Sequence, residues 1–287
     1  MAADPGTNDH WEWEIDHRAR WGIVDLRQLW SFRHLLGRLI RREFLVNYQQ
    51  TMLGPLWVVL QPVLTLVVYV LVFGRWMAVD TGTVPPVLFF LSGILLWGLC
   101  NDLFTGTAFI FTHYSYLFTK VYFPRVIIPL SIGGTHLARF AIQFFLLIGV
   151  LFFYGITGRF EFAFNAWLFF VLPAVLLTAA FSLAMGLIFS IATARYRDLS
   201  NIVHLGIRLA MFITPVIYPA AMVPEGLRWL VRINPLSAVF EVFRYGLLGQ
   251  GLFTPGDLIY SVVFITLFLL FALAWFNKLA AKLIDVV

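Results

Sequence analysis

Six long apolar stretches constrain this chain more than any other feature of its sequence. The hydrocarbon core of a bilayer is about 30 Å thick, so a helix that crosses it needs roughly 20 apolar residues in succession. Hydrophobic residues make up 61% of the chain and charged residues only 12%, far from the composition of a soluble domain. The sequence therefore predicts an all-α integral membrane protein with six transmembrane helices. The predicted spans cover residues 53–74, 87–111, 127–156, 166–193, 199–219 and 257–277.

The distribution of lysine and arginine predicts how these spans are oriented. If the N-terminus is cytoplasmic, thirteen basic residues fall on the cytoplasmic side of the membrane and five on the outer side. Cytoplasmic segments of membrane proteins carry such an excess of basic residues. Both termini are therefore expected in the cytoplasm. The same rule explains the net charge of +5 without a nucleic acid partner.

The N-terminal region divides into a polar part and an amphipathic part. Residues 1–24 are expected to form a polar tail, and residues 25–287 the six-span transmembrane domain. Within residues 25–47, apolar side chains alternate with arginines in a pattern typical of a helix that lies on the cytoplasmic face of a membrane. We therefore expect an interfacial amphipathic helix before the first span.

The segment between the fifth and sixth spans, residues 220–256, is outside by topology but is not hydrophilic. Pro224 can begin one short helix, and Asn234 followed by Pro235 can begin another, with an N-cap and a proline in the first turn. Half-helices can dip into a membrane where protein or a water-filled cavity shields them. The sequence predicts two such re-entrant half-helices in the outer leaflet.

The sequence contains no motif for nucleotide binding or covalent chemistry. It lacks the phosphate-binding pattern GxxxxGK[ST] as well as HExxH, CxxC and GxSxG. Asp102 is the one carboxylate in the interior of a predicted span, and one carboxylate is too few for most acid–base catalysis or proton coupling. We therefore expect no metal site and no cofactor on this chain, and an enzyme is disfavoured.

Polar side chains recur every four residues in three of the spans, so within each span they share a helix face. For the first and fifth spans we favour a solvated or sugar-lined path, because aromatic, amide and imidazole groups suit a carbohydrate. The third span carries Ser131, Thr135, Arg139 and Gln143, which interhelical packing explains equally well. The predicted path residues are Trp57, Gln61, Thr65, Tyr69, His204, Arg208 and Met211.

Three charged residues are expected near the middle of the bilayer. Asp102, Arg139 and Arg208 each lie about ten residues from the cytoplasmic end of a span, which corresponds to a depth of about 15 Å. An unpaired charge at that depth costs about 2.5–3.5 kcal/mol on insertion scales. We expect Asp102 and Arg139 to form an ion pair, and Arg208 to face a hydrated cavity.

The link between the second and third spans, residues 112–125, is short and aromatic and contains Pro124. A loop that needed only to be soluble would not expose so many aromatic side chains, and exposed apolar patches usually mark interfaces. We therefore expect this link to contact a partner protein. The residues expected to make the contact are Tyr114, Tyr116, Phe118, Lys120, Tyr122, Phe123 and Arg125.

Several short segments follow one another along the chain in a characteristic order. They are residues 50–57 (QTMLGPLW) running on to Gln61-Pro62, 120–125 (KVYFPR), 197–199 (RDL), 214–219 (TPVIYP) and 234–236 (NPL) leading to Glu241 and Arg244. In these segments the chain resembles the membrane subunit of bacterial ABC exporters for lipid-linked polysaccharides, such as O-antigens and teichoic acids. Each segment alone is a weak signal, and their colinearity makes the resemblance specific.

The resemblance implies a permease in the bacterial inner membrane that works as a homodimer with two copies of a separate ATPase. ATP and Mg would be bound by that partner, and the link 112–125 would be the coupling helix that contacts it. Spans one and five would line the pore. The half-helices within 220–256 would form an outer gate, with Arg228, Arg232, Asn234, Glu241 and Arg244 as its candidate residues.

The substrate implied by the resemblance is a polysaccharide linked to undecaprenyl diphosphate. Arg38, Arg41 and Arg42 precede the first span and are candidates for binding the diphosphate. Anchoring to anionic membrane lipids, worth about 1 kcal/mol for each arginine, explains these residues at least as well. Two alternatives stay open, a permease of the same architecture for a drug or a lipid, and a secondary transporter or channel that works without ATP.

Overall fold

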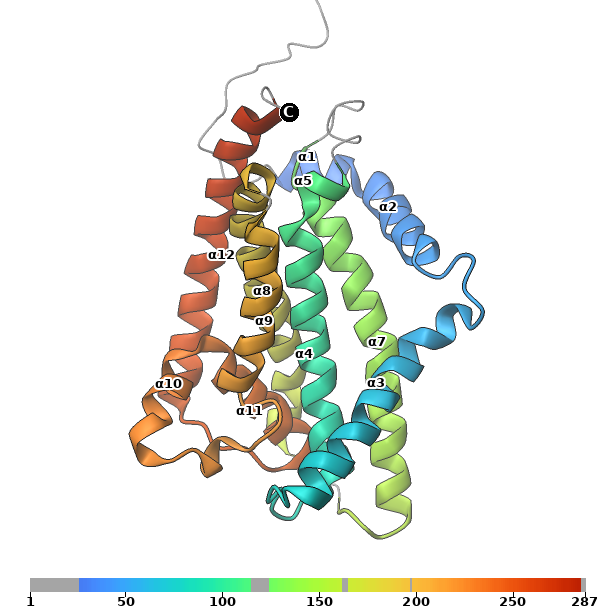
Figure 1. The fold of residues 1–287 in the computed structure, drawn as a ribbon, viewed down its shortest axis with the longest axis vertical. Helices are drawn as coiled ribbons and strands as arrows, with labels where there is room; N and C mark the ends of the chain where they lie inside the picture. Colours follow the sequence, from blue (N-terminus) through green and yellow to red (C-terminus); the bar gives the residue numbers. More distant parts are fainter. Residues whose placement is uncertain (1–25, 115–123, 162–164, 197, 285–287) are drawn as a thin grey trace, which may run out of the picture.

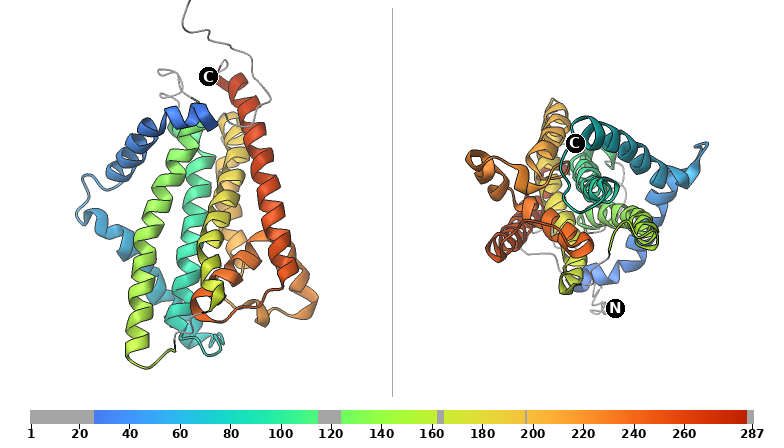
Figure 2. Two further views of the ribbon diagram at one scale, coloured as in Figure 1. Left: turned by 180° about the vertical axis from the view of Figure 1, so that it is seen from behind. Right: turned by 90° about the horizontal axis from the view of Figure 1, so that it is seen from below.

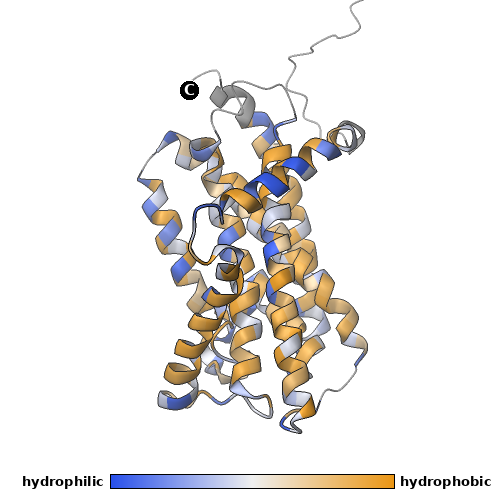
Figure 3. Ribbon diagram, turned by 90° about the vertical axis from the view of Figure 1, so that its right-hand side faces the viewer, coloured by the Kyte–Doolittle hydropathy of each residue, from blue (hydrophilic) through white to orange (hydrophobic). Residues whose placement is uncertain are grey.

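The computed structural model describes residues 26–114, 124–161, 165–196 and 198–284. Over these residues the chain forms helices joined by turns and short loops, without a β-strand. Five helical segments are long and apolar enough to cross a membrane, and hydrophobic residues cover most of their length (Figure 3). These segments are Gly54–Trp76, Pro86–Ala108, Ile127–Ile156, Ala166–Arg195 and Pro255–Leu279. The multi-span helical architecture expected from the apolar stretches is thus confirmed.

Helix α4 (Pro86–Ala108) runs through the centre of the bundle (Figure 1), and most of its side chains are buried. Its closest neighbour is α8 (Val171–Arg195). Gly186 of α8 lies so close to α4 that a Cβ atom on it would come within 2.5 Å of the Thr107 Cβ. Lipid supplies no hydrophobic drive between helices, so close approach at small residues is what holds such a pair together.

The first crossing is irregular in two places. Helix α3 (Trp57–Tyr69) contains Pro62, and it continues directly into the π-helix η2 (Val70–Trp76). Proline removes one backbone hydrogen bond from a helix and bends it. In the bundle α3 crosses obliquely over α7 (Ile127–Ile156), which forms the third crossing (Figure 1).

The helix in the predicted fifth span is shorter than we expected. α9 (Leu199–Ile213) has 15 residues, which corresponds to about 22 Å, whereas the predicted span ran from 199 to 219. Pro215 explains the early end, because a proline disfavours helical backbone at the residue before it, and Thr214 is extended. α9 also packs loosely, and Val203 and Ile207 are its buried residues.

The segment after α9 contains the two short helices that the sequence predicts. α10 (Arg228–Ile233) follows a 3-10 turn, and α11 (Pro235–Leu248) follows directly. The Asn234 side chain accepts a hydrogen bond from the Leu236 N–H and so caps α11, as predicted. Gly249 ends α11 in a left-handed conformation with φ 71°. Both helices lie at the end of the bundle opposite α1 (Figure 1).

The predicted N-terminal helix is divided at Phe32 into α1 (Leu26–Ser31) and α2 (Arg33–Val46). α2 packs against α7, where Ile40 lies over Gly134. This contact is closer than we expected for a helix that lies on the surface of a membrane. The remaining elements are η1 (Gly54–Leu56), α5 (Ile110–His113), η3 (Ala166–Phe170), η4 (Ala220–Met222), η5 (Glu225–Leu227) and α12 (Pro255–Ile284).

Candidate functional site

A cavity of about 240 Å³, which we call the central pocket, lies between α3, α4, α7 and α9. Its wall is a mixture of amide, hydroxyl, aromatic and charged side chains with a few aliphatic ones. The lining residues are Gln61, Pro62, Thr65, Tyr69, Ile94, Leu95, Trp97, Gly98, Asn101, Asp102, Arg139, Gln143, Met211 and Val216.

The charged residues of the central pocket lie together. Arg139 Nη1 is 3.4 Å from Asp102 Oδ2, the contact expected for the ion pair predicted from the sequence. Asn101 Nδ2 donates a hydrogen bond of 3.1 Å to the other carboxylate oxygen. The Tyr48 ring, in the turn that follows α2, lies 6.0 Å from the guanidinium. Because the two charges cancel, the pocket offers hydrogen-bonding groups without a net charge from this pair.

The residues predicted to line a path divide into two groups. Gln61, Thr65 and Tyr69 of α3 line the central pocket, and the Tyr69 hydroxyl lies 3.7 Å from the sulfur of Met211 on α9. The predicted stripes of the first and fifth spans therefore meet at this contact. The other three, Trp57, His204 and Arg208, are exposed and do not line the pocket.

The polar stripe of the third span serves two purposes along its length. Ser131 and Thr135 are buried, and each hydroxyl donates a hydrogen bond to a carbonyl of its own helix, at 2.8 and 2.9 Å. Arg139 and Gln143, further along the helix, line the central pocket. Packing explains the first pair, and the pocket explains the second.

Helix α4 contributes polar and aromatic pocket residues that we did not predict. Trp97, Gly98 and Asn101 all line the central pocket beside Asp102. The spacing of four residues between Trp97 and Asn101 was the signal that could have found them, because it puts them on the same side of a helix.

We expect the ion pair to make a measurable contribution to stability. Asp102→Asn should lower the free energy of unfolding by about 1–2 kcal/mol, less than for a fully buried pair, because the Asp102 side chain is 35% exposed. Thermal unfolding of the purified protein in detergent measures the loss. Exchange of the two charges, Asp102→Arg with Arg139→Asp, should recover part of the stability that either single reversal loses. The pairing is refuted if the double reversal recovers none.

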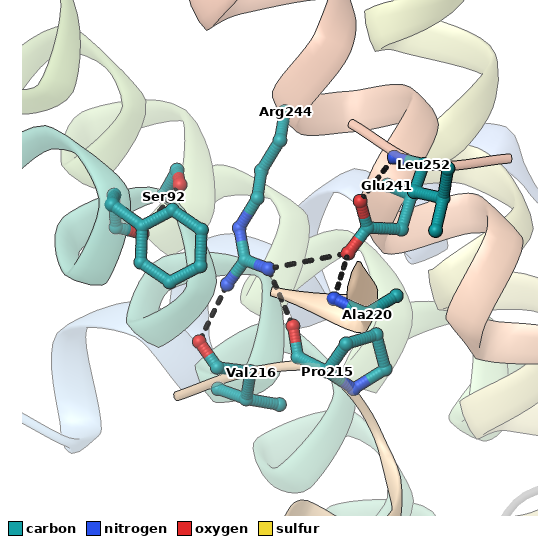
Figure 4. Close-up of polar contacts among 8 residues, drawn as sticks. Ser92, Pro215, Val216, Ala220, Glu241, Arg244 and Leu252 are labelled. Carbon is teal, nitrogen blue, oxygen red and sulfur yellow. Dashed lines mark hydrogen bonds and ion pairs between the residues drawn. The ribbon is translucent and has the colours of Figure 1, made fainter. Parts of the chain in front are cut away.

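A second cluster of charged side chains holds the turn after α9 (Figure 4). Arg244 of α11 is 1% exposed and donates hydrogen bonds of 2.5 Å to the Pro215 and Val216 carbonyls. Its guanidinium also lies 4.0 Å from the centre of the Phe89 ring. These contacts satisfy two carbonyls in the buried turn that follows α9.

Glu241, one turn before Arg244 on α11, completes this cluster. Its Oε1 is 3.7 Å from Arg244 Nη1 and accepts a hydrogen bond from the Ala220 N–H at 3.3 Å. Its Oε2 accepts one from the Leu252 N–H at 2.8 Å. The Glu241–Arg244 pair therefore joins α11 to the segments that precede and follow the two short helices.

The remaining residues predicted for an outer gate lie in different surroundings. Asn234 Nδ2 donates a hydrogen bond of 2.8 Å to Thr214 Oγ1, so this cap residue also holds the end of α9. Arg228 and Arg232 are exposed, and Arg228 forms a surface ion pair of 3.4 Å with Glu225. Both arginines line a separate cavity of about 230 Å³ beside α11.

At the opposite end of the bundle, Tyr114 connects the link between the second and third spans to α2. Its hydroxyl donates a hydrogen bond of 2.8 Å to Glu43 Oε2. Arg125, at the other end of the link, is half-buried, whereas Arg38, Arg41 and Arg42 are exposed on α2. The predicted contact residues Tyr116, Phe118, Lys120, Tyr122 and Phe123 lie outside the described residues.

The sequence matches a known family over most of its length. The family model described as ABC-2 type transporter matches residues 34–248. An O-antigen export system permease protein, RfbA of Klebsiella pneumoniae, is 29% identical over 92% of this chain and 100% of the relative. RfbA of Myxococcus xanthus is 31% identical over 76% of this chain and 82% of the relative. The capsule polysaccharide export inner-membrane protein CtrC of Neisseria meningitidis serogroup A is 24% identical over 80% and 84%, respectively.

Proposed function

Since this chain belongs to the ABC-2 type transporter family, we propose that it is the permease subunit of an exporter that moves a polysaccharide across the bacterial inner membrane. The relatives named for O-antigen export and for capsule polysaccharide export support the class of substrate. The five long apolar helices agree with a multi-pass membrane protein. The chain itself carries out transport and no covalent chemistry.

The observation that carries the substrate class is the composition of the central pocket. Gln61, Asn101 and Gln143 present amides, Thr65 and Tyr69 present hydroxyls, and the Asp102–Arg139 pair adds no net charge. The hydroxyl groups of a neutral sugar can form hydrogen bonds with these side chains. The aromatic rings of the pocket can stack on the apolar faces of sugar rings. A drug or lipid with a large apolar body would be better served by a mainly aliphatic cavity.

We place six crossings in the membrane, with α9 as the fifth. The first described helix, α1, and the C-terminal end of α12 lie at the same end of the bundle (Figure 2), which supports an even number of crossings. α9 and the residues that follow it, up to Tyr218, form this fifth crossing, and α12 forms the sixth. The excess of lysine and arginine supports a cytoplasmic position for that end.

The two short helices form the outer end of this path. Nearly every residue of α11 is buried among the other helices, so protein shields its backbone where it re-enters the outer leaflet. Asn234 and Arg244 hold this outer gate to Thr214 and to the turn that follows α9, and Glu241 pairs with Arg244. Arg228 and Arg232 face its surface.

The proposed assembly contains two copies of this chain and two copies of a separate ATPase, which binds ATP and Mg. The second copy would cover α3 and α9, both of which expose several large apolar side chains. The ATPase would contact the link 112–125. The hydrogen bond from Tyr114 to Glu43 would transmit a movement of this link to α2. The arginines of α2, Arg38, Arg41 and Arg42, would face lipid headgroups or the diphosphate of a lipid-linked substrate.

Depletion of the protein tests the proposed function. We expect surface polysaccharide to disappear and lipid-linked polymer to accumulate on the cytoplasmic side of the inner membrane, measured by fractionating the glycans from both sides. The wild-type gene supplied in trans should restore export. Unchanged surface polysaccharide without accumulation inside would exclude this function and favour a permease for a drug or a lipid.

A further inference from the structure

Pro62 leaves one backbone carbonyl of α3 without its helical donor. In an α-helix the N–H of residue 62 would donate to the carbonyl of residue 58, but proline has no N–H. Val58 is 1% exposed, so its carbonyl is not freely hydrated. A buried carbonyl without a donor is costly, and more so within a bilayer.

Gln143 of α7 supplies the missing donor. Its Nε2 donates a hydrogen bond of 2.9 Å to the Val58 carbonyl. The orientation of the amide is set by chemistry, because only its NH₂ group can donate to a carbonyl. The bond joins α7 to α3 one turn before Pro62, at the point where the helix lacks its own hydrogen bond.

The same side chain belongs to the wall of the central pocket. Gln143 lines the pocket together with Gln61 and Thr65, which lie on the two sides of Pro62. A helix bends most easily at a proline, so the position of these two side chains depends on what holds the helix there. The hydrogen bond to the Val58 carbonyl therefore helps to fix the positions of Gln61 and Thr65 in the wall of the central pocket.

We propose that Gln143 is a positioning residue for transport: by donating to the carbonyl that Pro62 leaves free, it holds α3 against α7 and sets the shape of the central pocket. The proposal rests on the proposed function for its transport readout. Its geometric part, that the hydrogen bond from Gln143 is needed because residue 62 is a proline, does not depend on which substrate the protein transports.

The test uses Gln143→Leu and Gln143→Met in the full transporter, both of which remove the donor at similar side-chain size. We expect export of surface polysaccharide per folded transporter to fall by about tenfold or more, since the pocket is no longer held in its working geometry. ATP hydrolysis by the complex should stay within about twofold, because the ATPase contact at the cytoplasmic end is untouched. Gln49→Leu, an exposed glutamine between α2 and α3, is the matched control and should export normally.

The second measurement is the melting temperature of the variants with and without Pro62. In Pro62→Ala the residue at 62 regains an N–H, which can bond to the Val58 carbonyl within the helix. We therefore expect Gln143→Leu to lower the melting temperature of the Pro62→Ala protein by less than half of what it costs the wild type, the signature of two coupled positions.

Three results would overturn the proposal. They are normal export by Gln143→Leu, an equal loss of melting temperature in both backgrounds, and a parallel fall of ATP hydrolysis and export, which would indicate simple misfolding. Failure of the proposed function would look different. Surface polysaccharide would then be unchanged when the wild-type protein is depleted, while the coupling between positions 62 and 143 would still be measured.

Discussion

Arg244→Leu is expected to lower the free energy of unfolding by about 3–5 kcal/mol, because the substitution leaves the Glu241 carboxylate buried without its partner. The Pro215 and Val216 carbonyls lose their donors in the same step. Denaturant or thermal unfolding in detergent measures the loss, and the amount of protein in the membrane should fall with it. Arg244→Lys should cause a smaller loss of stability than Arg244→Leu, because an ammonium keeps the charge but lacks the planar guanidinium that reaches both carbonyls.

The chain offers a matched control for this prediction. Arg228 and Glu225 form an ion pair with the same spacing of three residues, but their side chains are 44% and 88% exposed. An exposed pair of this kind contributes about 0–1 kcal/mol, so Arg228→Leu should change the stability by no more than that. Equal losses at positions 228 and 244 would contradict the role that we give to burial.

The second large effect is expected at Gly186→Leu, where α8 meets α4. A side chain there would press on the Thr107 Cβ at 2.5 Å and on the Phe104 carbonyl oxygen at 3.0 Å. The carbonyl belongs to a helix backbone and cannot move aside, so we expect a loss of about 3 kcal/mol, the upper part of the usual range for overpacking. The same unfolding measurement detects it, together with a lower yield of folded protein.

Gly149→Leu on α7 is the control for crowding. No atom lies within 4 Å of a Cβ at this position, and leucine suits a helix surface better than glycine does. We expect unchanged or slightly higher stability. If both glycine substitutions cost the same, the loss at Gly186 comes from something other than the contact between α4 and α8.

The parts of the fold that local sequence controls were predictable. The third span was predicted as 127–156 and is a helix with those bounds, because its apolar run is long and begins shortly after Pro124. The start of α11 was predictable for a similar reason, since Asn234 followed by Pro235 is a local cap. The early end of α9 has a local signal too, in Pro215, although the apolar run continues past it.

The site itself depended on contacts that no local pattern contains. The central pocket needs α3 and α4 side by side, and the sequence alone did not indicate that Trp97 and Asn101 of α4 would face Gln61 of α3. Arg244 was a candidate for a gate, but its bond to the Pro215 carbonyl spans 29 residues. Periodicity predicts which face of a helix is polar, and it does not predict the partner of that face.

The bonds from Arg244 also have a consequence for the biosynthesis of the protein. The Val216 carbonyl is made 28 residues before the arginine that satisfies it, an interval of roughly 1–6 s at translation rates of about 5–20 residues per second. A nascent chain that ends within this interval lacks the arginine that satisfies two carbonyls in the turn after α9, and unsatisfied carbonyls are costly in hydrocarbon. α9 and α11 should therefore leave the insertion machinery and settle in the bilayer as a single hairpin.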